Sequence, residues 1–350
     1  MNIRIMDKII SIIIPTYNME KYLERCLSSL LVDRKNDIEV LVVNDGSNDG
    51  SLQIAQKFAN QYPDVFRVID KSNGNYGSCV NAAMKVATGK YVKLLDADDA
   101  FDTANFNMMM GILMDMDADM ILTDYVKNYG EGTKETISFS IPDNRIIGFD
   151  EITMNRDVRR VMMHAVTYRR ENLLKIGYVQ SEGIFYTDNE WIFRPLSTVK
   201  TVFYLHLPVY IYSLDREGQS VDPTVEQLHS MDNIKVSCAM LRASSLIRNS
   251  DISEPVKEFL NSRLYNRIRH QYKDYIVNGR FTDMKELDFL DDNVCDYDGG
   301  MYLDLNHELL SKPLFCLPYI YMWRMHPKSH LQRVVISTYN RYKRLKKKHS

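Results

Sequence analysis

The chain has 350 residues, of which 45% are hydrophobic and 26% charged, a balance that is ordinary for a soluble globular protein with one large and one smaller domain. Its five cysteines show no C-x-x-C spacing, and no segment approaches the roughly 20 apolar residues that cross a bilayer. The net charge of −2 hides an acidic body and a basic tail, because residues 309–350 carry ten Lys or Arg and no acid. These features exclude a disulfide framework, a membrane span and a nucleic-acid partner, so we expect reduced thiols and a cytoplasmic location.

The first third of the chain alternates apolar runs with amphipathic stretches. Four runs, at residues 9–14, 38–43, 65–69 and 90–95, are expected to form buried strands. The stretches between them have apolar residues at helical spacing. This alternation predicts an α/β fold with a parallel, helix-covered sheet and right-handed crossovers.

Each predicted strand is followed by a polar loop. Residues 15–18 follow the first strand, Asp45 the second, residues 73–77 the third, and Asp96 and Asp98 the fourth. Because the carboxyl ends of parallel strands share one edge, these loops line one crevice, which suits a base, a ribose and a diphosphate. The chain has neither the G-x-x-x-x-G-K-[ST] nor the G-x-G-x-x-G phosphate loop, so a diphosphate would need a metal as counter-charge.

The loop after the fourth run places three carboxylates, Asp96, Asp98 and Asp99, within four residues. Acids this close repel one another, which favours a site for a hard cation such as Mg²⁺ or Mn²⁺. The alternative is a solvated acidic turn that caps the helix starting near Thr103, since Asp and Thr are good N-cap residues.

Four motifs, taken in order, carry a family resemblance. Residues 12–18 (IIIPTYN), 43–50 (VNDGSNDG), 88–91 (TGKY) and 96–99 (DADD) together resemble the family 2 glycosyltransferases, inverting enzymes of the GT-A fold. The resemblance is strong over residues 9–125 and weaker beyond. It implies a GT-A type, mostly parallel sheet, a nucleotide-diphospho-sugar donor, usually a UDP-sugar, and Mn²⁺ or Mg²⁺ as cofactor.

The same resemblance assigns roles to residues of the crevice. Thr16, Tyr17 and Asp45 would surround the base. Asp96 would lie near the ribose, and Asp98 would bind the metal. The complete set of donor-binding residues that we expect is Pro15, Thr16, Tyr17, Asn18, Asp45, Gly46, Asn73, Gly74 and Asp96.

The chain departs from the family pattern on one side of the donor. Many members have Ala-Arg-Asn after the glycine loop, whereas this chain has Cys-Val-Asn at residues 79–81, so an arginine that could approach the donor is missing. Lys71 or Lys93 is the expected replacement. In the acidic turn, the resemblance makes Asp99 a supporting acid rather than a metal ligand.

A second chemical constellation lies at residues 182–191. The family pattern has an acid-aspartate pair before a helix here, and this chain has Thr187 and Asp188, which keeps only the aspartate. Inversion by direct displacement needs one base at the acceptor hydroxyl, and we assign that catalytic role to Asp188. The alternative is that Thr187 or Asp188 simply caps the helix that contains Trp191.

Two further residues have open roles. Arg216 lies in a loop, residues 213–220, that resembles a family loop after the acceptor region, and it would stabilise the leaving diphosphate as a catalytic residue. An exposed arginine in a salt bridge is the alternative. His164 lies inside the apolar run 158–169, where a satisfied core histidine is favoured over a catalyst.

We predict a GT-A domain over residues 1–222, with a donor half to about residue 125 and an acceptor half from residue 126, and a helical domain over residues 223–350. The predicted function is metal-dependent, inverting transfer of a sugar from a nucleotide-diphospho-sugar to a hydroxyl of a glycan or lipid-linked acceptor in surface polysaccharide biosynthesis. The rival is a non-catalytic nucleotide-sugar-binding subunit that keeps the fold for assembly. This non-catalytic alternative stays open because the chain differs from the family pattern at residues 79–80 and at Thr187.

The tail indicates where the protein works. The aromatic run 313–323 and the basic run 341–348 flank a segment whose apolar residues fit one helix face, a pattern typical of attachment to anionic lipid. The alternative is a solvated basic tail behind a buried aromatic core. We therefore expect a cytoplasmic protein and a candidate for peripheral attachment to the inner face of the membrane.

Overall fold

The structure is a computed structural model that describes residues 8–214, 219, 222–310 and 318–325. It divides into two compact units, Met1–Ser220 with Ile252–Phe259 and Val221–Asp251 with Leu260–Ser350. Arg216 and the basic run 341–348 lie outside the described residues, as do residues 313–317 of the aromatic run. In the part that the structure describes, no helix is both long and apolar enough to cross a membrane.

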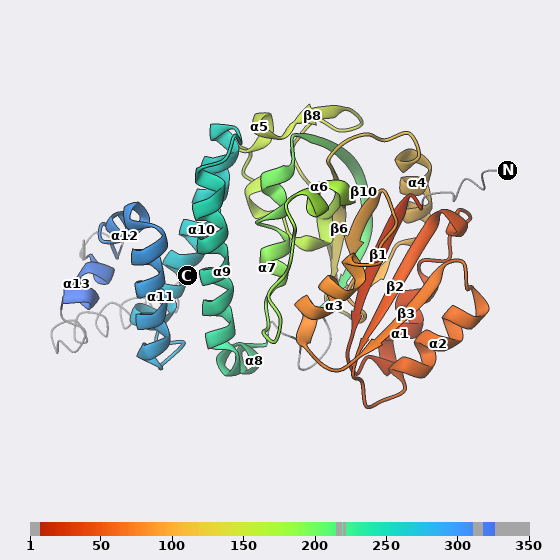
Figure 1. Cartoon of the computed structure of the whole chain (residues 1–350), viewed down its shortest axis with the longest axis horizontal. Coiled ribbons are helices and arrows are strands. Elements are labelled where there is room, and N and C mark those ends of the chain that lie inside the picture. Colours follow the sequence, from red (N-terminus) through yellow and green to blue (C-terminus); the bar gives the residue numbers. More distant parts are fainter. Residues whose placement is uncertain (1–7, 215–218, 220–221, 311–317, 326–350) are drawn as a thin grey trace. The chain divides into compact units, whose positions relative to one another are not determined.

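Among the described residues, a ten-stranded sheet forms the core of the first unit (Figure 1). Its strands follow the order β3-β2-β1-β4-β9-β6-β10-β5, with β7 beside β6 and β8 beside β10. The strands are β1 (Ile10–Thr16), β2 (Ile38–Asp45), β3 (Phe66–Lys71), β4 (Tyr91–Leu94), β5 (Ala100–Phe101), β6 (Met120–Asn128), β7 (Lys134–Ile137), β8 (Ile146–Gly148), β9 (Val166–Arg169) and β10 (Thr201–Ser213).

Helices cover this sheet. They are α1 (Glu20–Ser28), α2 (Ser51–Gln61), α3 (Asn75–Met84), α4 (Thr103–Leu113), α5 (Phe149–Ile152), α6 (Arg170–Lys175) and α7 (Asp188–Trp191), with 3₁₀ turns at Lys35–Asp37, Val158–Arg160, Met163–Ala165 and Pro195–Thr198. α3 packs on β1 and β2, and α2 packs on β2 and β3.

The part of the sheet formed by β1 to β4 is parallel, as the sequence predicts. β1 pairs with both β2 and β4, and β2 pairs with β3, all in parallel. Every residue of β1 except Pro15 is buried, which is typical of a strand covered on both faces. The predicted α/β class, with a mostly parallel sheet covered by helices and a helical C-terminal region, is confirmed.

The other part of the sheet is mixed. β9 lies between β4 and β6 and is antiparallel to both. β10 is one strand of 13 residues that runs parallel to β6 through register shifts on both sides of Pro208. The sequence indicated two strands here, at residues 199–206 and 209–212. Pro208 has no amide N–H for the ladder, and the strand accommodates it by an irregularity instead of ending.

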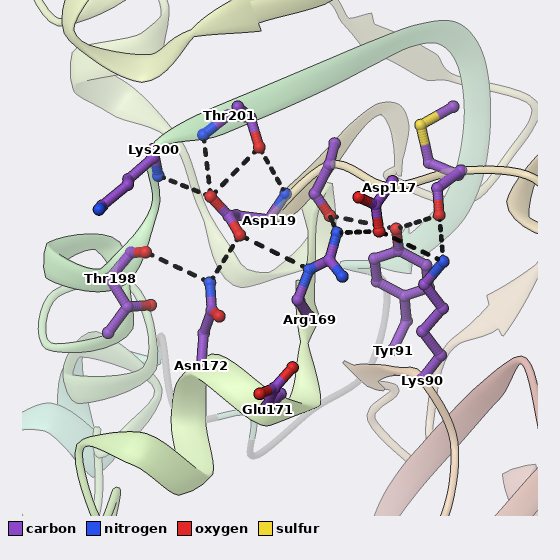
Figure 2. Close-up of polar contacts among 12 residues, drawn as sticks. Lys90, Tyr91, Asp117, Asp119, Arg169, Glu171, Asn172, Thr198, Lys200 and Thr201 are labelled. Atoms are coloured by element: carbon purple, nitrogen blue, oxygen red, sulfur yellow. Dashed lines mark hydrogen bonds and ion pairs between the residues drawn. The ribbon is translucent and has the colours of Figure 1, made fainter.

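A polar cluster around Asp119 holds the starts of β6 and β10 to the end of β9 (Figure 2). Asp119 precedes β6, and its carboxylate accepts hydrogen bonds from the backbone N–H groups of Lys200 at 2.9 Å and Thr201 at 3.0 Å. It also accepts the side-chain amide of Asn172 at 2.9 Å and lies 3.5 Å from the Arg169 guanidinium. Burial alone would raise the pKa of Asp119, but the hydrogen bonds from Asn172, Lys200 and Thr201 hold it below its ordinary value. One carboxylate therefore ties β6, β9, β10 and α6 together at the edge opposite the predicted crevice.

The second unit is helical. It contains α8 (Pro223–Leu228), α9 (Ser230–Arg248), α11 (Met284–Tyr297), α12 (Gly299–Leu305), α13 (Tyr319–Met325), and the part of α10 (Glu254–Lys273) from Leu260 onward, which continues into a π-helical turn at Asp274–Asn278. As predicted, α10 has Pro255 in its first turn, and the helical stretch closes at Gly279, whose φ is 61°. Leu241, Leu264 and Ile268 are fully buried, so the apolar stripes of α9 and α10 form core.

Candidate active site

The loops that follow β2 and β3 meet at Asp45. Asp45 ends β2 and is only 3% exposed, and its carboxylate accepts hydrogen bonds from Lys71 Nζ at 2.5 Å and from the Gly74 N–H at 3.0 Å. The Asn73 side chain donates to the Asp45 carbonyl at 3.0 Å. Lys71 closes β3 and Gly74 precedes α3, so the cluster joins two strand ends to one helix start. The structure thus brings together three of the expected donor residues, Asp45, Asn73 and Gly74.

The loop after β1, which begins at Pro15, lies against the loop after β2. Thr16 is buried at the end of β1, whereas Tyr17 is 45% exposed and leaves its ring open to a ligand. Asn18 has a φ of 54°, and its side chain accepts a backbone N–H of the loop after β2 at 2.9 Å. In that loop, Gly46 has a φ of 73°, a conformation in which a residue with a side chain would be strained.

Tyrosines hold the acidic turn. The Asp96 carboxylate accepts the Tyr76 hydroxyl of α3 at 2.8 Å. Asp99 is 1% exposed, and its carboxylate accepts the Tyr210 hydroxyl and the Ser213 backbone N–H, both at 2.7 Å. Burial raises the pKa of Asp99 well above its ordinary value, and the neighbouring carboxylates add to the rise. Asp99 is therefore fixed in the protein interior, whereas Asp96 and Asp98 are half-buried.

The helix that follows the turn has its own cap. Asp102 precedes α4, and its carboxylate accepts the Asn105 backbone N–H at 2.9 Å. The alternative interpretation, in which the acids at residues 96–99 cap this helix, is therefore wrong.

Three side chains at the turn could hold a metal ion. Among the described residues, one ligand atom each of Asp96, Asp99 and His164 lie within 4.8 Å of one another. Atoms bound to one ion at bond lengths of about 2.1 Å lie roughly 3–4.3 Å apart, so small side-chain adjustments would bring all three to a single ion. Asp98 is outside this group, and its carbonyl accepts the Arg25 guanidinium at 2.5 Å. The assignment of Asp98 as metal ligand stays a prediction.

His164 lies in an aromatic cage in the turn before β9. Its ring stacks on Tyr125 and Tyr212, with centroids 5.2 and 4.2 Å apart, and meets Tyr210 edge-on at 4.7 Å. Its Nδ1 has no hydrogen-bond partner in the described part of the chain. Burial first and the charge of Lys93 second lower the pKa of His164 to about 3, so the ring is neutral. His164 is thus a core residue, as the sequence favoured, but the described residues do not satisfy its Nδ1.

Both lysines that we expected near the donor have protein partners. Besides Asp45, Lys71 donates to the Ser78 hydroxyl at 2.8 Å. Lys93 is fully buried and donates to the carbonyls of His164 at 2.8 Å and Val166 at 3.1 Å. Burial lowers the pKa of Lys93 to about 7. Lys71 therefore borders the donor loops, whereas Lys93 supports the turn that carries His164.

The segment before α7 is held against α3. Asn81 of α3 donates its amide to the Gln180 carbonyl and the Glu182 carboxylate, both at 2.8 Å, and accepts the Gln180 N–H at 2.9 Å. Gly77 of α3 has no room for a side chain, because an added Cβ would lie 1.9 Å from the Ser181 carbonyl oxygen. The helix that follows the donor loop thus carries the acceptor-side segment on its surface.

Asp188 is the first residue of α7 and lies within electrostatic reach of the acidic turn. Burial first and the charge of Asp96 second raise the pKa of Tyr76, and the charge of Asp188 adds to this rise. Thr187 precedes the helix without a side-chain cap hydrogen bond, so a capping role for its hydroxyl has no support in the geometry. Asp188 and the acidic turn therefore share one part of the molecule.

The end of β10 connects the acidic turn to the loop of Arg216. Ser213 binds Asp99 through its N–H, accepts the Arg25 guanidinium on its hydroxyl at 3.0 Å, and accepts the Gln219 side chain on its carbonyl at 2.7 Å. Arg216 itself is outside the described residues, so its catalytic role stays a prediction.

Sequence reasoning missed the residues that support the site. Tyr210 and Ser213 contact Asp99 across more than a hundred positions, and no local pattern marks them. Tyr76 could have been identified from the sequence, because it lies in loop 73–77, which was predicted to line the crevice.

Known proteins share this sequence and fold. The family described as glycosyl transferase family 2 matches residues 11–176. The uncharacterised glycosyltransferase YibD of Escherichia coli is 30% identical over 233 residues, which cover 64% of this chain and 65% of that protein. The uncharacterised glycosyltransferase EpsJ of Bacillus subtilis is 29% identical over 213 residues, 59% of this chain and 61% of that protein. The chain therefore spans less than two thirds of the length of both relatives.

Solved structures show the same fold. The crystal structure of S. aureus TarS 1-349 in complex with UDP-GlcNAc has a TM-score of 0.66 at 22% sequence identity, and the match covers 82% of this chain and 80% of that chain. At this identity the likeness concerns the fold, and it agrees with the fold class expected from the sequence.

Proposed function

We propose that the chain, whose residues 11–176 match glycosyl transferase family 2, transfers a sugar, with inversion, from a UDP-sugar to a hydroxyl of a glycan or lipid-linked acceptor. One observation carries the proposal. The Gly74 N–H donates to Asp45 at 3.0 Å, while the Gly74 carbonyl accepts the Gly183 N–H at 2.8 Å. A single residue thus links the carboxylate expected at the base to the segment that leads to Asp188.

The donor would occupy the crevice between the loops after β1, β2 and β4. The exposed Tyr17 ring offers a stacking face, and Asp45 offers a fixed acceptor for the N–H of a pyrimidine. Asp96, oriented by Tyr76, would accept a ribose hydroxyl or face the diphosphate. A divalent cation, Mn²⁺ or Mg²⁺, held at Asp96 and Asp99 would supply positive charge beside the diphosphate.

Asp188 would act as the general base. As the acceptor oxygen forms its bond to C1 of the sugar, Asp188 takes the hydroxyl proton. The bond from C1 to the phosphate oxygen breaks on the opposite side, and UDP leaves with the electron pair. Arg216 would stabilise the negative charge that grows on the leaving UDP.

The proposal also includes the cellular location of the protein. The basic run 341–348 would attach the protein to the anionic inner face of a membrane, where a lipid-linked or nascent surface glycan could serve as acceptor. This element rests on sequence alone.

Donor turnover tests the proposal and its rival. We would incubate the full chain with Mn²⁺ and a panel of UDP-sugars, beginning with UDP-GlcNAc because a protein of the same fold binds it, and measure UDP release. A glycosyltransferase should release UDP slowly from one donor even without acceptor, and the Asp188→Asn variant should not. A non-catalytic subunit would bind a UDP-sugar without releasing UDP. Failure to bind any of the donors would contradict both the glycosyltransferase and the non-catalytic subunit.

A further inference from the structure

We propose that His164 supplies a nitrogen ligand to the divalent cation of the donor site, alongside Asp96 and Asp99. The inference rests on the proposed function, since the cation would be the one that accompanies the nucleotide diphosphate. One ring nitrogen of His164 and one carboxylate oxygen of each acid lie within 4.8 Å of one another. The three residues come from two distant segments of the chain, the turn after β4 and the turn before β9.

The state of the His164 ring supports a ligand role. His164 is 4% exposed, and its Nδ1 has no hydrogen-bond partner among the residues that the structure describes. Buried polar atoms are nearly always paired, so a buried ring whose Nδ1 is unpaired, and of which one nitrogen lies near two carboxylates, calls for an explanation. A cation between the three side chains would use the imidazole and offset the repulsion between the acids.

The His164 ring is also fixed in place. Tyr125 and Tyr212 both stack with it, and Tyr210 makes a T-shaped contact with it. The backbone of the same turn is held by Lys93, which donates to the His164 carbonyl at 2.8 Å. A ring held in this way is preorganised, as a metal ligand requires.

The two carboxylates have the outer hydrogen bonds that orient metal ligands. Tyr76 donates to Asp96 at 2.8 Å, and Tyr210 donates to Asp99 at 2.7 Å. Tyr210 therefore positions two members of the group, because it holds Asp99 through its hydroxyl and His164 through its ring.

A nitrogen ligand has a consequence for metal choice. Sites made of carboxylates alone suit Mg²⁺ and Ca²⁺ as well as Mn²⁺, whereas an imidazole favours transition metals. The site should therefore prefer Mn²⁺ or Co²⁺ over Mg²⁺, and the His164→Gln variant should lose most of that preference. We expect the variant to bind Mn²⁺ at least about tenfold more weakly than the parent protein.

Pulsed electron paramagnetic resonance on the full chain with Mn²⁺ and UDP reads the ligands directly. A bound imidazole gives a ¹⁴N signal, and a bound diphosphate gives a ³¹P signal. We expect both signals in the parent protein and loss of only the ¹⁴N signal in His164→Gln. His206→Gln is the matched control, because His206 is an exposed histidine of the same unit, paired with Asp124 at 2.7 Å, and this variant should keep both signals.

The outcomes separate this inference from the proposed function. A ³¹P signal without a ¹⁴N signal, or a ¹⁴N signal that persists in His164→Gln, overturns the role of His164 and leaves the UDP site intact. Absence of both signals, with no Mn²⁺ bound, overturns the proposed donor site itself. Parent protein grown with ¹⁵N-labelled histidine provides a test that does not depend on the variant folding. If a histidine binds the Mn²⁺, the ¹⁴N signal should be replaced by a ¹⁵N signal, and an unchanged ¹⁴N signal would overturn the inference.

Discussion

Replacing Asn81 by Ala should loosen the segment that leads to Asp188. The Asn81 side chain makes three hydrogen bonds, two of them to the backbone N–H and carbonyl of Gln180, a residue that is 1% exposed. The substitution leaves these two buried groups unpaired, at about 1–3 kcal/mol each. Because water can partly enter the vacated space, we expect the free energy of unfolding to fall by about 2–4 kcal/mol. A domain of ordinary stability remains folded after such a loss.

Thermal unfolding and turnover together test this reasoning. For a unit of this size the loss corresponds to a decrease in Tm of roughly 4–16 °C. The UDP affinity should change little, because Asn81 lies outside the Asp45 cluster, while UDP release should fall at least about tenfold as Asp188 is displaced. Glu182→Ala, which removes only an exposed acceptor, should unfold like the parent protein. An unchanged Tm in Asn81→Ala, or a proportional loss of UDP affinity and turnover, would refute the positioning role.

Four further predictions address the chemistry, the metal, the fold and the tail. Asp188→Asn should reduce turnover by about 10²–10⁴ without changing UDP affinity, and a variant that keeps turnover while losing affinity would make Asp188 structural. Asp98→Asn should weaken Mn²⁺-dependent UDP binding in calorimetry by about 10–100-fold, because it removes a charge beside the proposed cation, and unchanged binding would exclude Asp98 from the site. The pKa of Asp119 is lowered in the folded state, so its stabilisation is present above the unfolded pKa of about 3.9 and is lost as the pH falls through the folded pKa. The difference in Tm between the parent protein and Asp119→Asn should therefore begin to decrease as the pH falls below about 4, and a difference that grows over that range would contradict the assignment. Finally, the full chain should co-sediment with anionic vesicles more than with neutral ones, and a chain that ends at Ser329 should lose this preference; equal binding by both proteins would remove the tail from the proposal.

The sequence predicted the elements that depend on local pattern. The β-branched run from Ile10 to Ile14 forms β1, and two of the four loops that were expected to share one edge, those after β2 and β3, meet at Asp45. Helix ends were also predictable, as at Gly279, because capping depends on residues that are close in the chain.

Features that depend on distant partners could not be predicted in this way. β9 has only four residues, and its place between β4 and β6 is decided by pairing with strands that lie far away in the chain. The role of Asp99 depends on Tyr210, which is 111 positions away, and the state of His164 depends on an aromatic cage assembled from two other strands. Periodicity carries no information on such contacts.

The place of β9 also affects how the protein is made. In the sheet of the described residues, β9 lies between β4 and β6, and the ribosome completes it about forty residues after β6. Until then a nascent chain has two strand edges with unpaired N–H and C=O groups, which are templates for aggregation. A gene fragment that stops near residue 130 should therefore yield insoluble protein, although it encodes the loops after β1, β2, β3 and β4. Completion of the sheet between β4 and β6 therefore needs the part of the chain beyond residue 130.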